Sequence, residues 1–208
     1  LILGLQILHR GKYPAETLPQ RVERLMHASQ QLQNLVDDLL IMAKQEQDKI
    51  RLDYQDVDLI ALVKGVVRDY ETIASQKDIQ LETKIEAINL TACLDSPIFH
   101  RILGNLLSNA IKFSPEQGKI TISLSCPSLN IVNVAIADQG PGVDDALKAK
   151  VFEPYEIGTI MPNVSQIGLG LAFCKMMVEA HQGAIAITDN TPKGAILSLT
   201  IPRRPPVV

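Results

Sequence analysis

The segment HRILGNLLSNAIKF, residues 100–113, carries the pattern that decides the fold. Its apolar side chains recur at helical spacing on one face, which predicts a helix over 97–112 that packs on a core. Arg101, Asn105, Asn109 and Lys112 follow at intervals of four, four and three residues and share another side. Because asparagine is a mediocre helix former, two of them one turn apart indicate either a solvated face or a ligand site.

Helical and alternating patterns are interleaved on both sides of this segment. Further helices are predicted at 59–75 and 169–181. Alternation of apolar and polar residues predicts strands at 79–85, 120–124, 131–136, 184–187 and 195–201. Helices interleaved with a mixed sheet predict an α/β sandwich for this part of the chain.

The first 49 residues carry a different pattern. Apolar residues over 18–43 alternate steps of four and three, with one polar interruption at Ser29, which is a heptad seam. A shorter helix before Gly11 and Pro14 would turn back into the longer one and form a helical hairpin. Since a lone hairpin exposes its seam, we expect two copies to form a dimeric four-helix bundle, the alternative being a hairpin packed on its own chain.

The stretch 44–58 is charged and polar, and we interpret it as a linker with a short strand near Leu52. The predicted boundary lies near Asp48. The expected class is therefore α+β, with a helical hairpin at 1–49 followed by an α/β sandwich at 50–204.

Composition excludes several functions. The 208 residues include 20 Lys and Arg against 23 Asp and Glu, a net charge of −3, which argues against nucleic-acid binding. Three scattered cysteines favour reduced thiols in a cytoplasmic protein, and the four histidines lack metal-site spacing. We also expect no membrane contact and no signal peptide, because no run approaches 18 apolar residues and the apolar start has no basic leader.

Two glycine-rich elements follow the helix of residues 100–113. In AIADQGPGV, Asp138 ends a strand and Gly140 and Gly142 follow it, so that a carboxylate could accept a hydrogen bond from an exocyclic amine while the backbone approaches a flat ring. In QIGLGLAFCKMM, Gly168 and Gly170 stand where a loop enters a helix, which is a possible anion site. Taken singly, each could equally be a turn or a helix-entry contact.

In this order, and with FEPYE at 152–156 between the second and third, the three elements resemble the N, G1, F and G2 boxes of sensor histidine kinases. The resemblance covers nearly the whole chain. It implies a dimerisation and phosphotransfer hairpin at 1–49 and a catalytic ATP-binding domain of the Bergerat type at 50–204. It also implies transfer of the ATP γ-phosphoryl group to a histidine, and then to the aspartate of a response-regulator receiver domain.

The resemblance also implies roles for the residues on the helix and at the strand end. Asn109 would hold the Mg²⁺ that bridges the phosphates, with Asn105 supporting it. Lys112 would neutralise phosphate charge, and Asp138 would accept the adenine amino hydrogen. Gly140 and Gly142 would shape the adenine pocket. The implied nucleotide-binding set is completed by Phe152, Gly168, Leu169 and Gly170, of which the two glycines would free the lid and cradle phosphate.

The sequence departs from the family pattern at three places. The H box, which holds the phosphoacceptor histidine, is absent, and His9 and His27 lack the adjacent carboxylate, so we expect no self-phosphorylation. Gln166 replaces a glycine that often opens the G2 box. No Lys or Arg occurs over 153–167, where family lids often supply a cation.

Two alternative functions remain at this stage. A gyrase-like ATPase of the same superfamily would place a glutamate, which can activate water, at the position of Asn105. A nucleotide-sensing dimerisation module without phosphotransfer is compatible with the missing acceptor and the uncharged lid.

Overall fold

The computed structural model describes residues 51–156 and 168–204 together with Val22, Leu25 and Ser29. The chain divides into two compact units, Leu1–Lys49 and Ile50–Val208. The three isolated residues of the first unit are helical. The predicted hairpin over 1–49 and its dimeric bundle otherwise lie outside the described residues, so the account below concerns the second unit.

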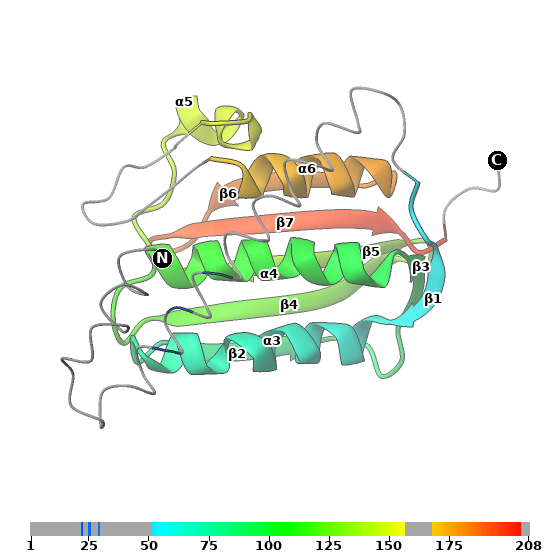
Figure 1. The fold of residues 1–208 in the computed structure, drawn as a ribbon, viewed down its shortest axis with the longest axis horizontal. Coiled ribbons are helices and arrows are strands. Elements are labelled where there is room, and N and C mark those ends of the chain that lie inside the picture. The colour runs from blue at the N-terminus through cyan, green and yellow to red at the C-terminus, as the bar shows by residue number, and fades with distance from the viewer. Residues whose placement is uncertain (1–21, 23–24, 26–28, 30–50, 157–167, 205–208) are drawn as a thin grey trace. The chain divides into compact units, whose positions relative to one another are not determined.

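The second unit is a two-layer sandwich in which helices cover one face of a mixed sheet (Figure 1). The long helices in the described part are α3 (Leu59–Ser75), α4 (Ser96–Phe113) and α6 (Gly170–Ala180). The five-stranded sheet has the order β2-β4-β5-β7-β6. Its strands are β2 (Gln80–Ile85), β4 (Lys119–Ser128), β5 (Ile131–Ala137), β6 (Ala184–Asp189) and β7 (Ala195–Pro202). β2 runs parallel to β4 and the other neighbours are antiparallel, which confirms the predicted mixed sheet.

The core lies between the helices and the sheet. Along β5 and β7, and over residues 119–125 of β4, every second side chain is buried, because successive side chains of a strand point to opposite faces. α4 buries eight residues along one face, as the pattern of residues 100–113 predicts. The buried side chains from these four elements include Ile102, Leu106, Ile120, Val134 and Leu199.

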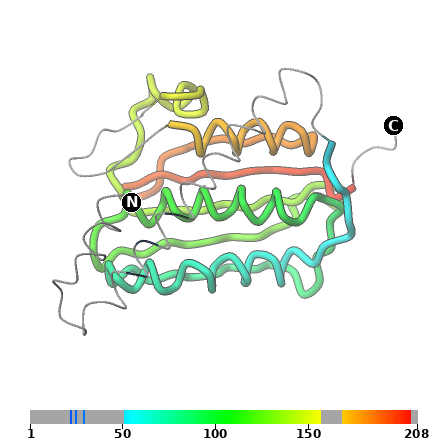
Figure 2. The backbone as a smooth tube through the Cα atoms, in the orientation of Figure 1, coloured from blue at the N-terminus to red at the C-terminus, as the bar shows by residue number. Residues whose placement is uncertain are grey.

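A separate two-stranded sheet lies where the described chain enters the domain. It pairs β1 (Gln55–Asp58) with β3 (Thr91–Leu94) in antiparallel register. The expected strand near Leu52 is therefore wrong by three residues, and β3 was not predicted. Tertiary pairing rather than apolar alternation defines β1, whose sequence QDVD holds one apolar residue. The N–H of Cys93 donates to the carbonyl of Arg203, so this small sheet adjoins the end of β7 (Figure 2).

Local signals explain where α4 begins and ends. The carboxylate of Asp95 caps the helix by accepting from the N–H of Ile98 at 3.1 Å, and a proline stands in the first turn. Ser114 ends the helix in an extended conformation and Pro115 follows it. No helix among the described residues has the length and apolar character needed to cross a membrane.

Candidate functional site

Asp138 lies at the end of β5, where the strand meets the glycine-rich loop. Its side chain is buried, with 6% of the residue exposed. The carboxylate Oδ1 accepts from the N–H of Gly140 at 2.8 Å and from the N–H of Ala195 at 3.1 Å. Both bonds reach the same oxygen, and within residues 51–156 and 168–204 no hydrogen bond reaches Oδ2. The carboxylate is thus fixed by one oxygen and can accept from a ligand with the other.

Burial raises the pKa of Asp138, since desolvation disfavours the charged form. The N–H groups of Gly140 and Ala195 favour the carboxylate and offset part of that effect. A buried carboxyl with a displaced pKa is typical of a functional site rather than of a solvated turn.

The turn between β6 and β7 forms the wall behind Asp138, and sequence reasoning missed it. The N–H of Asp138 donates to the carbonyl of Ala195 at 2.9 Å, and the side-chain amide of Asn190 donates to the carbonyl of Asp138 at 2.7 Å. Gly194 has φ +120°, and a Cβ there would lie 2.0 Å from the carbonyl oxygen of Asp138. The only local signal is the turn-like sequence NTPKGA, which does not identify the loop that it contacts.

The glycines of the Asp138 loop allow close approach of the backbone. A Cβ on Gly140 would lie 2.9 Å from the carbonyl oxygen of Phe113, the last residue of α4. Gly142 has φ +79°, a conformation that side chains rarely adopt. The loop therefore reaches the C-terminal end of α4 as well as the β6–β7 turn.

Asn105, Asn109 and Lys112 lie on the second half of α4 and are each half-buried. Burial lowers the pKa of Lys112. The Nδ2 of Asn105 is buried without a hydrogen-bond partner among the described residues. An unpaired buried amide costs free energy, which is expected where a ligand completes the hydrogen bonding.

The start of α6 lies against the same helix and against the region of residues 152–156. A Cβ on Gly170 would lie 3.9 Å from the side-chain amide of Asn105. Gly168 has φ +74°, and its carbonyl accepts from the N–H of Tyr155 at 2.9 Å. Leu169 and Phe152 are both buried. The residues predicted from separate segments are thus linked pairwise: Gly140 to the end of α4, Gly170 to Asn105, and Gly168 to Tyr155.

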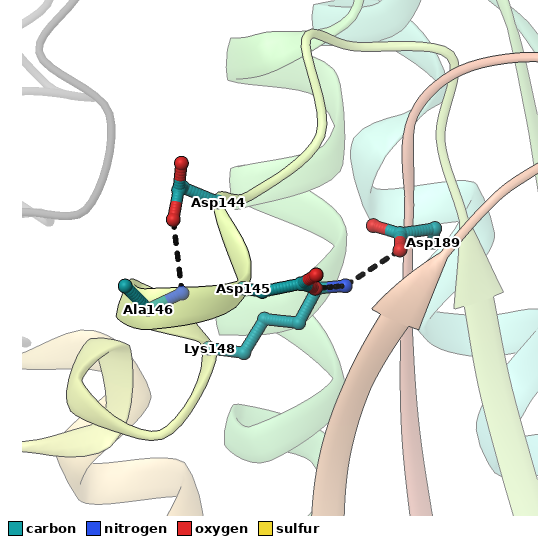
Figure 3. Close-up of polar contacts among 5 residues, drawn as sticks. All are labelled: Asp144, Asp145, Ala146, Lys148 and Asp189. Carbon is teal, nitrogen blue, oxygen red and sulfur yellow. Dashed lines mark hydrogen bonds and ion pairs between the residues drawn. The ribbon is translucent and has the colours of Figure 1, made fainter.

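Lys148 links the first of the two short helices between β5 and α6 to the end of β6 (Figure 3). α5 (Asp145–Lys148) precedes the 3-10 helix η2 (Lys150–Phe152). The Nζ of Lys148 contacts Asp145 at 2.5 Å and Asp189, the last residue of β6, at 2.6 Å. These two carboxylates raise the pKa of Lys148 and hold its charge at the edge of the β6–β7 turn.

Residues that could hold a divalent cation are few in the described part of the chain. No group of three His, Cys, Asp or Glu side chains there is arranged as a metal site. The amide oxygen of Asn109 is a donor of the kind that Mg²⁺ accepts when substrate phosphates and water supply the remaining ligands.

Comparison with known proteins yields consistent similarities. Residues 94–205 match the family described as histidine kinase-, DNA gyrase B-, and HSP90-like ATPase. The sensor histidine kinase TmoS of Ectopseudomonas mendocina is 31% identical over 189 residues. The structure of full-length ShkA in complex with AMPPNP is 27% identical, with a TM-score of 0.74 over 96% of this chain and 42% of that one. Histidine kinase ThkA in complex with response regulator protein TrrA is 26% identical, with a TM-score of 0.69 over 97% of this chain and 57% of that one.

The chain corresponds to part of the proteins that it matches. The alignment with TmoS covers 90% of this chain but 19% of the length of TmoS.

Proposed function

Because the chain belongs to the histidine kinase-, DNA gyrase B-, and HSP90-like ATPases and carries a sensor histidine kinase catalytic domain, we propose that it transfers the γ-phosphoryl group of ATP to a histidine. An aspartate of a response-regulator receiver domain then takes the group from that histidine. The observation that carries the proposal is the buried Asp138 carboxylate, which the N–H groups of Gly140 and Ala195 hold beside a loop whose glycines, Gly140 and Gly142, leave little room for a side chain.

Asp138 selects adenine in this proposal. Its Oδ2 accepts a hydrogen bond from the exocyclic amine of the base, which adenine has at the position where guanine has an oxygen. Gly140 and Gly142 keep the loop free of side chains, so that the flat base can approach the backbone. Phe152, buried in the short helix that packs against α6, supports the helix whose start binds the phosphates.

The phosphates are bound along α4 and at the start of α6. Lys112 neutralises phosphate charge, and the N–H groups near Gly168, Leu169 and Gly170 add the positive end of a helix. Asn109 holds Mg²⁺ through its amide oxygen, and the unpaired Nδ2 of Asn105 supports the same region. Mg²⁺, when bound, neutralises the charge that develops on the phosphates during transfer.

The reaction is an in-line displacement. The bond between the γ-phosphorus and the bridging oxygen breaks as the nitrogen of the acceptor histidine bonds to phosphorus, and ADP leaves. Catalysis by this chain consists of holding the two ends of the nucleotide, because the transition state is stabilised chiefly by position and charge. The similarity to ThkA, whose structure includes a response regulator protein, supports a receiver domain as the next acceptor.

We propose that residues 1–49 supply a homodimer through the heptad seam and that residues 50–204 act as the catalytic domain. A cytoplasmic location, as part of a larger sensor, accords with the need for ATP. Light scattering on the full chain and on residues 50–208 measures the oligomeric state. We expect the full chain to be a dimer and residues 50–208 to be a monomer. A monomeric full chain at tens of micromolar would contradict the bundle.

The function is tested by adding ATP labelled on the γ-phosphate to the chain with a separately produced H-box hairpin. The expected product is an acid-labile label on the hairpin, which moves to a receiver domain added next. Asn109→Ala should abolish labelling, whereas Asn89→Ala, an exposed loop asparagine, should not. Binding of ATP without transfer to any hairpin would favour a nucleotide-sensing module instead, and steady release of phosphate without a hairpin would favour an ATPase.

A further inference from the structure

Lys77, which is not one of the proposed site residues, makes three hydrogen bonds at the end of α4. It lies in the turn between α3 and β2, well before the motifs in the sequence. Its Nζ donates to the carbonyl of Ile111 at 2.9 Å, to that of Lys112 at 3.2 Å and to that of Ser114 at 3.1 Å. The three donors of one ammonium group are thus used on two carbonyls of the last turn of α4 and on the carbonyl of the residue that follows the helix.

These bonds satisfy carbonyls that would otherwise have no partner. The last carbonyls of a helix lack intrahelical donors and carry its negative end. In α4 the carbonyl of Ala110 accepts from the N–H of Ser114, and those of Ile111 and Lys112 accept from Lys77. The positive charge of Lys77 therefore stabilises the helix end both by hydrogen bonding and by its position.

Lys77 is itself held in place by its backbone. Its N–H donates to the carbonyl of Ala74 at 3.0 Å, and its carbonyl accepts from the N–H of Gln117 at 3.0 Å. The lysine therefore joins the end of α3 to the turn that follows α4. Its side chain reaches α4 from a fixed origin, so it can determine the position of the last helical turn.

The last turn of α4 carries the residues assigned to the phosphate end of the nucleotide. Asn109 and Lys112 project from it, and the carbonyl of Phe113 lies against Gly140 in the Asp138 loop. Asp138 has other anchors, because Ala195 and Asn190 hold it from the β6–β7 turn. A change at Lys77 should therefore affect the phosphate side of the site more than the base side.

We propose that Lys77 is a positioning residue that holds the last turn of α4 so that Asn109 and Lys112 face the Mg²⁺-bound phosphates. The inference rests on the proposed function, since it assumes that this turn binds phosphate. It goes beyond that function by assigning a role to a residue outside the nucleotide-binding motifs.

The test compares affinities for Mg-ATP and for adenosine, measured by calorimetry on the full chain. Lys77→Met should weaken Mg-ATP binding by about tenfold and leave adenosine binding within about twofold. Lys77→Arg, which keeps the charge and several donors, should restore most of the Mg-ATP affinity. Lys64→Met removes an exposed lysine of α3 and should change neither affinity.

Hydrogen exchange provides a second readout that does not require nucleotide. In Lys77→Met the amides at the end of α4 should exchange faster, while those of α6 stay protected. If Lys77→Met fails to fold, the same measurements on Lys77→Gln replace it. An unchanged ratio of Mg-ATP to adenosine affinity, or an equal loss of both, would overturn the inference. Failure of the unsubstituted chain to bind Mg-ATP would instead refute the proposed function.

Discussion

The side-chain amide of Asn190 donates a 2.7 Å hydrogen bond to the main-chain carbonyl of Asp138, which joins the β6–β7 turn to the strand end that carries the buried carboxylate. Asn190→Ala removes this donor and leaves the carbonyl to find another. We expect weaker binding of ATP and ADP alike, by about 0.5 to 1.5 kcal/mol, because the change acts at the base and not at the γ-phosphate. Calorimetric titration with both nucleotides measures it.

Asn89→Ala is the matched control, since Asn89 is exposed in the loop after β2. A loss confined to ATP would contradict the assignment of this wall to the base.

The second prediction separates the two asparagines of α4. Asn105→Leu replaces a buried amide whose Nδ2 has no partner among the described residues by an apolar group of similar size. We expect the melting temperature to be maintained or raised, because an unsatisfied buried donor is removed, while ATP binding weakens. Thermal unfolding followed by titration with ATP shows both effects.

Asn109→Ala should differ from Asn105→Leu in its dependence on metal. Its effect on ATP binding should shrink when Mg²⁺ is withdrawn, because the lost ligand no longer matters without the ion. If Asn109→Ala changed ATP affinity equally with and without Mg²⁺, Asn109 would not be a ligand of the metal.

The third prediction concerns the buried carboxyl of Asp138. Since burial raises its pKa above the ordinary 3.8, the carboxylate becomes protonated at a higher pH than an exposed aspartate does. Adenosine affinity should therefore fall on acidification, starting above that ordinary range. Adenosine is the right ligand because ATP phosphates also titrate.

Asp138→Asn should bind adenosine weakly and with little dependence on pH over the same range. Asp144→Asn, in which an exposed carboxyl is removed, should keep the pH dependence of the unsubstituted chain. A parallel loss of adenosine affinity in Asp138→Asn on acidification would show that another group titrates.

The fourth prediction concerns stability at mildly acidic pH. The Nε2 of buried His181 accepts from the N–H of Asp95 at 3.1 Å, so Nδ1 carries the hydrogen that is shared with the carbonyl of Met177 at 2.7 Å. Burial lowers the pKa of His181, although Met177 and the carboxylate of Asp95 offset part of this. The neutral ring is the form that the fold requires.

The sign of the effect follows from linkage. The unfolded chain binds a proton near pH 6.5 and the folded chain binds it at lower pH, so the free energy of unfolding decreases as pH falls below about 6.5. Each unit by which the pKa is lowered corresponds to about 1.4 kcal/mol. Urea unfolding at pH 7.5 and 5.5 measures the difference. His181→Gln should reduce the difference in free energy of unfolding between the two pH values. His100→Gln, at an exposed site beside Asp69, should not reduce it.

The sequence predicted the parts of this domain that local chemistry specifies. α3 has the predicted limits, and the spacing of Asp138, Gly140 and Gly142 identified a loop with unusual backbone requirements. β1 and β3 were misplaced or missed because each is short and is defined by its partner strand. Alternation alone cannot show such pairing.

The residues that the sequence analysis did not identify make contacts over long sequence separations. Asn190 lies 52 residues from the carbonyl that it binds, and Lys77 lies 34 to 37 residues from its three acceptors. In sequence neither stands out, since Asn is a common turn residue and a single lysine in a polar turn carries no motif. Their contacts become visible only when the sheet and helices bring distant turns together.

The last prediction concerns discrimination between ATP and ADP. The sequence over 153–167 contains no Lys or Arg, and its structure beyond Glu156 lies outside the described residues. Among the described cations near this segment, Lys148 contacts Asp145 and Asp189, Lys175 lies 3.7 Å from Glu153, and Lys150 is exposed in η2. The proposed site assigns the γ-phosphate to Lys112, Mg²⁺ and backbone amides.

ATP and ADP should therefore bind with affinities within about tenfold, or about 1.4 kcal/mol, because few charge-assisted contacts are specific to the third phosphate. Calorimetric titration of both nucleotides in Mg²⁺ measures the ratio. Gln166→Arg should shift it toward ATP if the segment covers that phosphate, whereas Gln76→Arg, at the end of α3, should not. A preference of the unsubstituted chain for ATP of a hundredfold or more would show that a basic group other than Lys112 contacts the γ-phosphate.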